Sequence, residues 1–234
     1  MQYAVITGAS QGIGKAIAEK LLAQGCPIAV CARDRNKLRT VVEEWRNTYT
    51  DADIIWTNAD LGTEKGVEEL AALVLGSFPQ IDILVNNAGT FATGLLAEEP
   101  EDMLDKMLQV NLYAAYRLSR KLLPQMKQQG SGHIFNMCSI ASLKAYAGIG
   151  AYSISKYALL GLTDNLREEL RSHGIKVTAI CPGSTWSPSW EGSDTAPERI
   201  MEAGDIAEMI WAASRLSPQA VAETIVMRPV KGDL

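Results

Sequence analysis

The sequence has few of the residues that build metal sites and disulfide frameworks. Only two histidines are present, His133 and His173, and neither stands with other metal-ligating residues at a recognisable spacing. The four cysteines form no C-x-x-C pair and lie in apolar, strand-like surroundings, which indicates buried free thiols in a reducing compartment. They are Cys26, Cys31, Cys138 and Cys181. We therefore expect no metal ion.

Long apolar runs and strong net charge are also missing. No run reaches the roughly 18 apolar residues that a membrane span needs. A net charge of −5 gives no electrostatic reason to expect nucleic acid or an anionic membrane as a partner. The chain begins on an apolar run without a basic segment and cleavage site, so we expect a cytoplasmic protein. Its 234 residues, 47% of them hydrophobic, are enough for one large globular domain.

A glycine-rich turn follows the first apolar run. Residues 2–7 are rich in β-formers, Gly8-Ala-Ser-Gln-Gly12-Ile-Gly14 comes next, and residues 15–24 carry an apolar stripe at helical spacing. A nucleotide-phosphate loop requires this order of strand, glycine turn and helix. Glycines let the backbone approach a pyrophosphate, and a helix N-terminus offers free N–H groups. The spacing differs from the common G-x-G-x-x-G fingerprint, and a plain tight turn is the alternative.

The end of the second predicted strand, residues 27–32, bears on the choice between NAD and NADP. An acidic residue there would accept a hydrogen bond from the ribose 2′-hydroxyl, whereas an arginine can pair with a 2′-phosphate. Ala32 ends the strand and Arg33 follows. Asp34 lies two positions beyond the strand end, where we expect it to cap the next helix, residues 35–49. We therefore expect NADP(H), with a solvated surface arginine as the alternative for Arg33.

Strands and helices alternate along the rest of the chain. Pro100 is expected at the first position of a helix over residues 99–129, and Pro124 is expected to kink or break its end. The pattern predicts a single doubly wound Rossmann-type α/β domain over residues 1–234. About seven mostly parallel strands would have helices on both faces and the ligand crevice at their carboxyl ends. Further strands are predicted at 52–59, 81–85, 133–138, 175–180 and 223–227, and further helices at 63–77, 151–171 and 203–214.

The stretch from Ser139 to Lys156 carries the residues that we expect to do the chemistry. Tyr152 and Lys156 are four residues apart, so on a helix they share a face. A phenol beside an ammonium suits proton transfer, because a positive charge favours the phenolate form. The hydroxyl of Ser139 can hold a carbonyl oxygen within reach of the phenol. For the Tyr-x-x-x-Lys pair alone, a packed ring and a solvated amine remain the alternative.

Ser139, Tyr152 and Lys156 together resemble the catalytic motif of the short-chain dehydrogenase/reductase family, and the resemblance covers essentially the whole chain. The run Thr7-Gly-x-x-x-Gly-x-Gly resembles the family's cofactor loop. Asn86-Asn-Ala-Gly89 resembles the tetrad that steadies the sheet and lines the cofactor ribose. The resemblance implies that Ser139 orients a carbonyl, Tyr152 donates a proton and Lys156 binds the nicotinamide ribose. It also implies that an asparagine at position 111, Asn111, kinks its helix and supports a proton relay.

The same resemblance implies a set of cofactor-binding residues. Asp60 and Leu61 would border the adenine, with a helix cap as the alternative for Asp60. Pro182 and Gly183 would start the loop over the nicotinamide, and Ser187 supplies a hydroxyl where the family often has threonine. The full set is Gly8, Ser10, Gly12, Ile13, Gly14, Arg33, Asp60, Leu61, Asn87, Ala88, Gly89, Tyr152, Lys156, Pro182, Gly183, Thr185 and Ser187.

Residues 184–203, rich in serine, proline and tryptophan, are predicted to form a mobile lid over the substrate. Trp186 and Trp190 are candidate substrate residues that could stack on a flat heterocycle. Simple apolar packing of the lid is the alternative. The segments 182–190 and 226–234 resemble the bacterial sepiapterin reductase-like branch, which implies a pterin ketone such as sepiapterin as a candidate substrate, beside a diketone.

These observations predict an NADPH-dependent reductase of a small-molecule ketone. One alternative is an oxoacyl-carrier-protein reductase, against which stands the lack of an evident basic cluster near the lid. Another is a non-catalytic NADPH-binding sensor, although such proteins usually lose the tyrosine or the lysine that this chain keeps. The resemblance implies a homodimer or homotetramer assembled through the two long helices.

Overall fold

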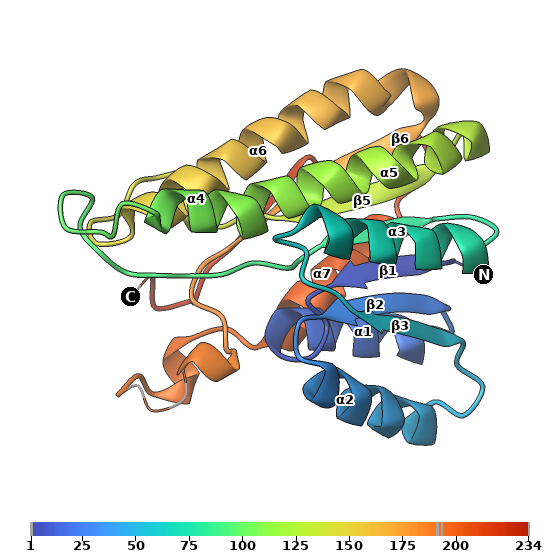
Figure 1. The fold of residues 1–234 in the computed structure, drawn as a ribbon, viewed down its shortest axis with the longest axis horizontal. Coiled ribbons are helices and arrows are strands. Elements are labelled where there is room, and N and C mark those ends of the chain that lie inside the picture. The colour runs from blue at the N-terminus through green and yellow to red at the C-terminus, as the bar shows by residue number, and fades with distance from the viewer. Residues whose placement is uncertain (1, 191, 193, 234) are drawn as a thin grey trace.

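In the computed structural model, the described part of the chain forms one sheet of seven parallel strands, in the order β3-β2-β1-β4-β5-β6-β7 (Figure 1). The structure describes residues 2–190, 192 and 194–233. Met1, Glu191, Ser193 and Leu234 lie outside the described residues, and with them parts of the predicted lid and the two ends of the predicted domain. The predicted fold class is confirmed.

The strands coincide with the apolar runs of the sequence. β1 lies between β2 and β4, so the strand order reverses between β1 and β4, and in such sheets the ligand crevice opens at that point. β6 is two residues longer than predicted and includes Pro182, which pairs with Met227 at its carboxyl end. The strands are β1 Ala4–Thr7, β2 Ile28–Ala32, β3 Ile54–Asn58, β4 Ile83–Asn86, β5 Gly132–Met137, β6 Ile175–Pro182 and β7 Thr224–Met227.

Helices cover both faces of the sheet. Successive side chains of a strand point to opposite faces, and in β1 Ile6 packs in one buried cluster while Val5 packs in the other. The first cluster joins the sheet to α1 Gly12–Ala23, α2 Arg35–Thr48 and α7 Ala203–Ser214. The second joins it to α3 Glu64–Ser77, α5 Ala114–Gln129 and α6 Gly150–Leu170. Figure 1 shows these two layers on either side of the strands.

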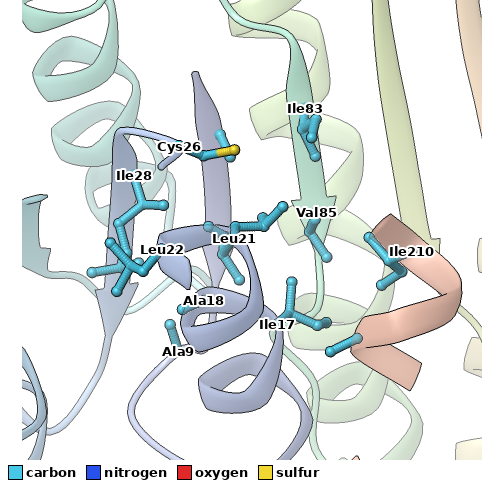
Figure 2. Close-up of a cluster of buried hydrophobic side chains, with 14 of the residues drawn as sticks. Ala9, Ile17, Ala18, Leu21, Leu22, Cys26, Ile28, Ile83, Val85 and Ile210 are labelled. Atoms are coloured by element: carbon cyan, nitrogen blue, oxygen red, sulfur yellow. The ribbon is translucent and has the colours of Figure 1, made fainter. Parts of the chain in front are cut away.

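The packing of α1 fixes the position of the glycine turn that precedes it. Figure 2 shows its apolar side chains, Ile17 and Leu21 among them, between the strands and Ile210 of α7. These three side chains are at most 1% exposed. Burying a leucine or isoleucine of this size contributes about 1.5–3 kcal/mol. The helix N-terminus is therefore held against the carboxyl end of β1.

The predicted helix over residues 99–129 is divided. α4 Met103–Leu108 and α5 are joined by a π-helical turn, Gln109–Tyr113, that contains Asn111. The expectation that Pro100 occupies the first helical position is wrong, because the helix begins at Met103. The expected break at Pro124 is also wrong, since α5 continues to Gln129. Pro124 is exposed, so water can solvate the carbonyl that loses its N–H partner.

In the described part of the chain, no helix is long and apolar enough to cross a membrane. The four cysteines are free thiols and all of them are buried. Burial raises the pKa of the Cys31 thiol to about 12. Among the described residues, no group of three or more histidine, cysteine, aspartate or glutamate side chains could hold a metal ion.

Candidate active site

A cleft of about 1430 Å³ lies along the carboxyl ends of the strands. It gathers the glycine turn, the ends of β2 and β3, the residues after β4, β5 and β6, and the start of α6. Every cofactor residue expected from the sequence lines it, as do Ser139 and Trp190. Asn111 and Trp186 do not. Parallel topology explains the gathering, because it places the carboxyl ends of all strands on one edge of the sheet.

The glycine turn is held by Asn87, which follows β4. Its side-chain amide donates to the carbonyl oxygens of Thr7 at 2.8 Å and Gly8 at 3.2 Å. In return, the Thr7 hydroxyl accepts hydrogen bonds from the backbone N–H groups of Asn87 at 2.9 Å and Ala88 at 2.8 Å. The turn that follows β1 and the one that follows β4 are therefore bound to each other at the point where the strand order reverses.

Two features open the turn to an anionic ligand. A Cβ added at Gly14 would lie 2.2 Å from the carbonyl oxygen of Gly8 and 2.4 Å from the Asn87 amide nitrogen, so only glycine fits. The N-cap residue of α1, Gln11, makes no side-chain capping hydrogen bond. The first N–H groups of α1 therefore lack the side-chain cap that Asp34 provides for α2 and Thr63 for α3.

The turn after β2 presents cations to the cleft. Arg33 and Lys37 are both exposed and line it, and neither has an ion pair with another described residue. The Asp34 carboxylate accepts hydrogen bonds from the backbone N–H groups of Asn36 and Lys37, each at 3.0 Å, so it caps α2 as the sequence predicted. Lys37 was missed by sequence reasoning, although its position four residues after Arg33 is a usable signal.

At the end of β3, Asp60 is exposed and Leu61 is buried, and both line the cleft. The Asp60 carboxylate accepts from the backbone N–H of Gly62 at 3.0 Å. The N-cap of α3 is Thr63, whose hydroxyl accepts from the N–H of Gly66 at 3.1 Å. The alternative role of Asp60 as the helix cap is therefore taken by Thr63.

Ser139, Tyr152 and Lys156 line one part of the cleft. The Ser139 hydroxyl accepts from the backbone N–H of Ala141 at 3.1 Å, and its own proton has no acceptor among the described residues. The Tyr152 hydroxyl likewise has no hydrogen-bond partner in the described part of the chain. Phe91 packs edge-on against the Tyr152 ring, with 4.9 Å between the centroids. Both hydroxyls are thus free to bond to a ligand.

Lys156 is only 5% exposed, and its ammonium lies 5.7 Å from the centroid of the Tyr152 ring. It donates to the carbonyl oxygen of Met137, at the end of β5, at 2.7 Å. No carboxylate pairs with it among the described residues. Burying a charge costs free energy unless it is compensated. The buried Lys156 ammonium therefore lowers the stability of the folded protein, and it lies in the same part of the cleft as the hydroxyls of Ser139 and Tyr152, whose protons have no acceptor among the described residues.

Asn111 lies behind the cleft rather than in it. Its side-chain oxygen accepts from the N–H of Thr90 at 2.7 Å, and its amide nitrogen donates to the Thr90 carbonyl at 3.0 Å and to Ser155 Oγ at 2.9 Å. A Cβ added at Gly89 would lie 3.2 Å from the Asn111 oxygen and 3.6 Å from Lys156 Nζ. Asn111 therefore joins the π-helical turn, the segment after β4 and α6 around the lysine.

The other asparagine of the tetrad is part of the core. Asn86 donates to Asn136 Oδ1 at 2.7 Å and to Ser119 Oγ at 3.1 Å. Asn136 in turn donates to Thr163 Oγ1 at 2.9 Å. This buried chain links β4, β5, α5 and α6, so it orients α6, the helix that carries Tyr152 and Lys156.

The segment after β6 places the two candidate tryptophans in different pockets. Thr185 pairs with Met201 in an isolated bridge, and the Trp186 N–H donates to the Met201 carbonyl at 2.8 Å, so the two ends of the predicted lid meet. Trp190 lies in a short 3-10 turn, Pro188–Trp190, and lines the cleft. Trp186 is 40% exposed and lines a separate pocket with Glu198. The structure therefore brings Trp190 to the candidate site and leaves Trp186 outside it.

Several lining residues were missed by sequence reasoning. Thr90 and Phe91 follow the tetrad directly, and Tyr146, Ala147 and Ile149 precede α6. None belongs to a motif or to an element with a regular apolar period. Their place in the cleft comes from how the loops after β4 and β5 fold, including the bridge between residues 94 and 149.

The family of the chain follows from comparison with known proteins. The family model described as short chain dehydrogenase matches residues 2–197. An uncharacterized oxidoreductase of Staphylococcus epidermidis is 31% identical over 229 residues, which cover 98% of this chain and 97% of that protein. The chain belongs to the short-chain dehydrogenase family, and its sequence resemblance to that family is confirmed.

Solved structures agree with this assignment. An alcohol dehydrogenase from the archaeon Thermococcus sibiricus, complexed with 5-hydroxy-NADP, has a TM-score of 0.91 at 27% identity and covers 100% of this chain and 99% of its own. L-sorbose reductase from Gluconobacter frateurii, complexed with NADPH and L-sorbose, has a TM-score of 0.89 at 27% identity, with 97% and 95% covered.

Proposed function

We propose that this protein is an NADPH-dependent reductase of a small, uncharged ketone. One observation carries the proposal: Ser139, Tyr152 and Lys156 line the same cleft as the glycine turn and the cations after β2. A nucleotide site and a proton donor therefore share one cavity. Membership of the short-chain dehydrogenase family supports an oxidoreductase reaction.

The residues of the cleft fit NADP(H). The close approach at Gly14 and the N-terminus of α1, which has no side-chain cap, suit a pyrophosphate. Arg33 and Lys37 suit a 2′-phosphate, since each is a cation without an ion pair among the described residues. Asp34 is engaged as the cap of α2, which leaves it poorly placed to accept from a ribose 2′-hydroxyl. NADP-bound relatives of the same fold lend further support.

The cofactor would supply a hydride, and the protein residues would manage the carbonyl oxygen. The Ser139 hydroxyl would donate a hydrogen bond to that oxygen, because its lone pair already accepts from Ala141. Tyr152 would give the oxygen its proton as general acid. Lys156 would bind a ribose hydroxyl and favour the phenolate that remains on Tyr152. Asn111, through Thr90 and Ser155, would hold this group in place.

Charge in the cleft limits the substrate class. Apart from Lys156, the charged side chains that line the cleft are Arg33, Asp34, Lys37 and Asp60, and all of these follow β2 or β3. Phe91 packs against the Tyr152 ring, and the aromatic side chains of Tyr146 and Trp190 also line the cleft. A ketone that is uncharged near its carbonyl fits this surface. A pterin such as sepiapterin or a diketone has that character, and the segment after β6 resembles the sepiapterin reductase-like branch in sequence.

The test is oxidation of NADPH and of NADH against sepiapterin, a small diketone and an acyl-thioester ketone. We expect turnover with NADPH and at least one of the first two substrates. Tyr152→Phe should lower kcat by roughly 10²–10⁴-fold while leaving NADPH binding intact. The matched control is Tyr49→Phe, because Tyr49 follows α2 and does not line the cleft.

Three results would change the proposal. Turnover with the acyl-thioester alone would favour the carrier-linked reductase. Tight NADPH binding without turnover of any substrate would favour the sensor. Equal activity in Tyr152→Phe and the original protein would contradict the assignment of Tyr152 as the proton donor.

We also propose that the protein works in the cytoplasm as a homodimer or homotetramer assembled through its long helices. Four free thiols support a reducing compartment. Tyr116 on α5 and Ile154 and Tyr157 on α6 are 39–43% exposed, which supports an apolar contact between copies. Light scattering after gel filtration measures the assembly, and a monomer at micromolar concentration would contradict it.

A further inference from the structure

The C-terminal tail, residues 228–233, contacts one wall of the cleft through Asp233 and also contacts the lid. The Asp233 carboxylate accepts a hydrogen bond from the Tyr146 hydroxyl at 2.9 Å, and Tyr146 lines the cleft before α6. Directly before the tail, the carbonyl of Met227 at the end of β7 accepts a hydrogen bond from the N–H of Gly183 at 2.8 Å, and Gly183 also lines the cleft. Within the tail, the carbonyl of Gly232 accepts a hydrogen bond from the Arg199 side chain of the lid at 3.5 Å. Asp233 is thus the residue through which the tail contacts the cleft at Tyr146, and we call this part of the cleft the substrate end.

The surroundings of Asp233 hold it in that position. Arg228 forms an ion pair with the same carboxylate oxygen that accepts from Tyr146. The other carboxylate oxygen is buried and has no hydrogen-bond partner in the part of the chain that the structure describes, and a Cβ added at Gly183 would lie 3.4 Å from it. The Asp233 side chain is 19% exposed. Removing one partner of a buried ion pair leaves the other charge uncompensated. We therefore expect a change at Arg228 or Asp233 to disturb the position of Tyr146 as well.

The hydroxyl of Tyr146 is committed to this contact. Burial and the hydrogen bond to Asp233 raise the pKa of Tyr146, so its phenol stays protonated where the proposed reaction runs. Its proton points to Asp233, so the ring is the part of the side chain that faces other groups, and the Lys144 ammonium lies 5.6 Å from its centroid. Tyr146 therefore differs from Tyr152, whose hydroxyl has no partner among the described residues.

We propose that Asp233 is a positioning residue for substrate binding: it holds the Tyr146 ring as one wall of the substrate end. Through its ion pair with Arg228, it also ties that wall to the end of β7, which accepts a hydrogen bond from Gly183. The inference rests on the proposed ketone reduction and narrows its substrate to a ketone with a flat or apolar group to pack on that ring. Asp233 does not touch the reacting atoms, so its loss weakens substrate binding and spares the chemical step.

The experiment compares Asp233→Ala, Asp233→Asn and Tyr146→Phe in steady-state kinetics. We expect Asp233→Ala to raise KM for the ketone about tenfold, the scale of a lost hydrogen bond to a charged group. kcat and the Kd for NADPH should stay within about twofold of the original protein. Asp233→Asn keeps an acceptor for the Tyr146 hydroxyl and should recover much of the KM. Combining Asp233→Ala with Tyr146→Phe should add little to either single effect.

The matched control is Asp164→Ala, which removes an exposed aspartate paired with Arg167 on the far part of α6 and should leave KM unchanged. An unchanged KM in Asp233→Ala would overturn the inference. Additive effects in the double variant would overturn it too. A loss of NADPH affinity as large as the change in KM would also overturn it, because a general collapse of the cleft would then explain both.

Hydrogen–deuterium exchange separates this inference from the proposed function. If the original protein reduces no ketone, the proposed function fails and the kinetic test cannot be read. Faster exchange of residues 144–150 and 183–187 in Asp233→Ala, with α3 unchanged, would still support the coupling between the two walls. Unchanged exchange in both segments would overturn it.

Discussion

The carboxylate of Asp34 accepts a hydrogen bond from the backbone N–H of Lys37 at 3.0 Å. This contact fixes the first turn of α2 and places two cations, Arg33 before it and Lys37 within it, along the same side of the cleft. The residue that would otherwise favour NAD thereby caps the helix that carries one of the two cations proposed to bind a 2′-phosphate.

Cofactor preference should follow these cations. We expect Arg33→Ala, and more strongly Arg33→Ala with Lys37→Ala, to weaken NADPH binding by roughly 10–100-fold, because each lost phosphate contact is charge-assisted. NADH binding should change little. Arg35→Ala is the control, since Arg35 adjoins the same turn but does not line the cleft. Titration of cofactor fluorescence measures the affinity of each protein for NADPH and for NADH, and equal loss for both cofactors would contradict the assignment.

Gly14 should not tolerate even one methyl group. Gly14→Ala places a carbon within 2.2–2.4 Å of Gly8 and Asn87 atoms, which forces the glycine turn away from its clamp. We expect NADPH affinity to fall by more than about 100-fold and Tm to drop by several degrees, as in other strongly strained substitutions. Gly161→Ala is the control: it lies in α6 with open space around it, so it should add about 0.5–1 kcal/mol of stability.

Asn111 should affect both stability and turnover. Asn111→Ala removes three hydrogen bonds to Thr90 and Ser155 and leaves the half-buried Thr90 backbone groups without these partners. We expect a loss of about 1–3 kcal/mol in the free energy of unfolding and a kcat reduced by at least about tenfold. Ser155→Ala removes only one of these bonds and serves as the comparison. A kcat that falls equally in both variants would indicate that the Thr90 contact is unimportant.

His133 should make the protein less stable in mild acid. Its ring is buried between β5 and β6, stacked on Phe135, and its Nε2 lies 2.7 Å from Thr178 Oγ1, whose proton goes to the Ala222 carbonyl. Nε2 therefore carries the ring proton, and Nδ1 is buried without a partner among the described residues. Burial, with a smaller contribution from Lys176, lowers the pKa of His133 from 6.5 to about 3.

Because the folded-state pKa of His133 is depressed, the unfolded chain binds the extra proton first. The neutral ring contributes its full stability above pH 6.5, and that contribution is lost as the pH falls from about 6.5 towards 3. Between pH 7 and pH 5 we expect the free energy of unfolding to fall by about 2 kcal/mol. Urea unfolding across this range measures it. His133→Leu should make the free energy of unfolding less dependent on pH in this range, whereas the exposed His173→Gln should not. A free energy of unfolding that does not change with pH in the original protein would contradict the expectation.

Much of the fold could be predicted from local patterns. Apolar runs such as those ending at Thr7 and Val85 are strands because parallel strands are buried on both faces. Helix boundaries were less certain: the π-helical turn at Asn111 depends on hydrogen bonds to Thr90 and Ser155, which are remote in sequence. Pro124 stays inside α5 because packing of the rest of that helix outweighs one lost backbone bond.

Sequence alone determined the class of the protein and the candidate residues that motifs carry, from Gly14 to Lys156, because each motif lies within one short stretch of the chain. Tertiary structure decided what depends on loops meeting across the sheet. It put Trp190 in the cleft and Trp186 outside it, and it joined Tyr146 to Asp233, which lies 87 positions further along the chain. No local pattern encodes such a contact, since it exists only after β5, β6 and β7 have paired.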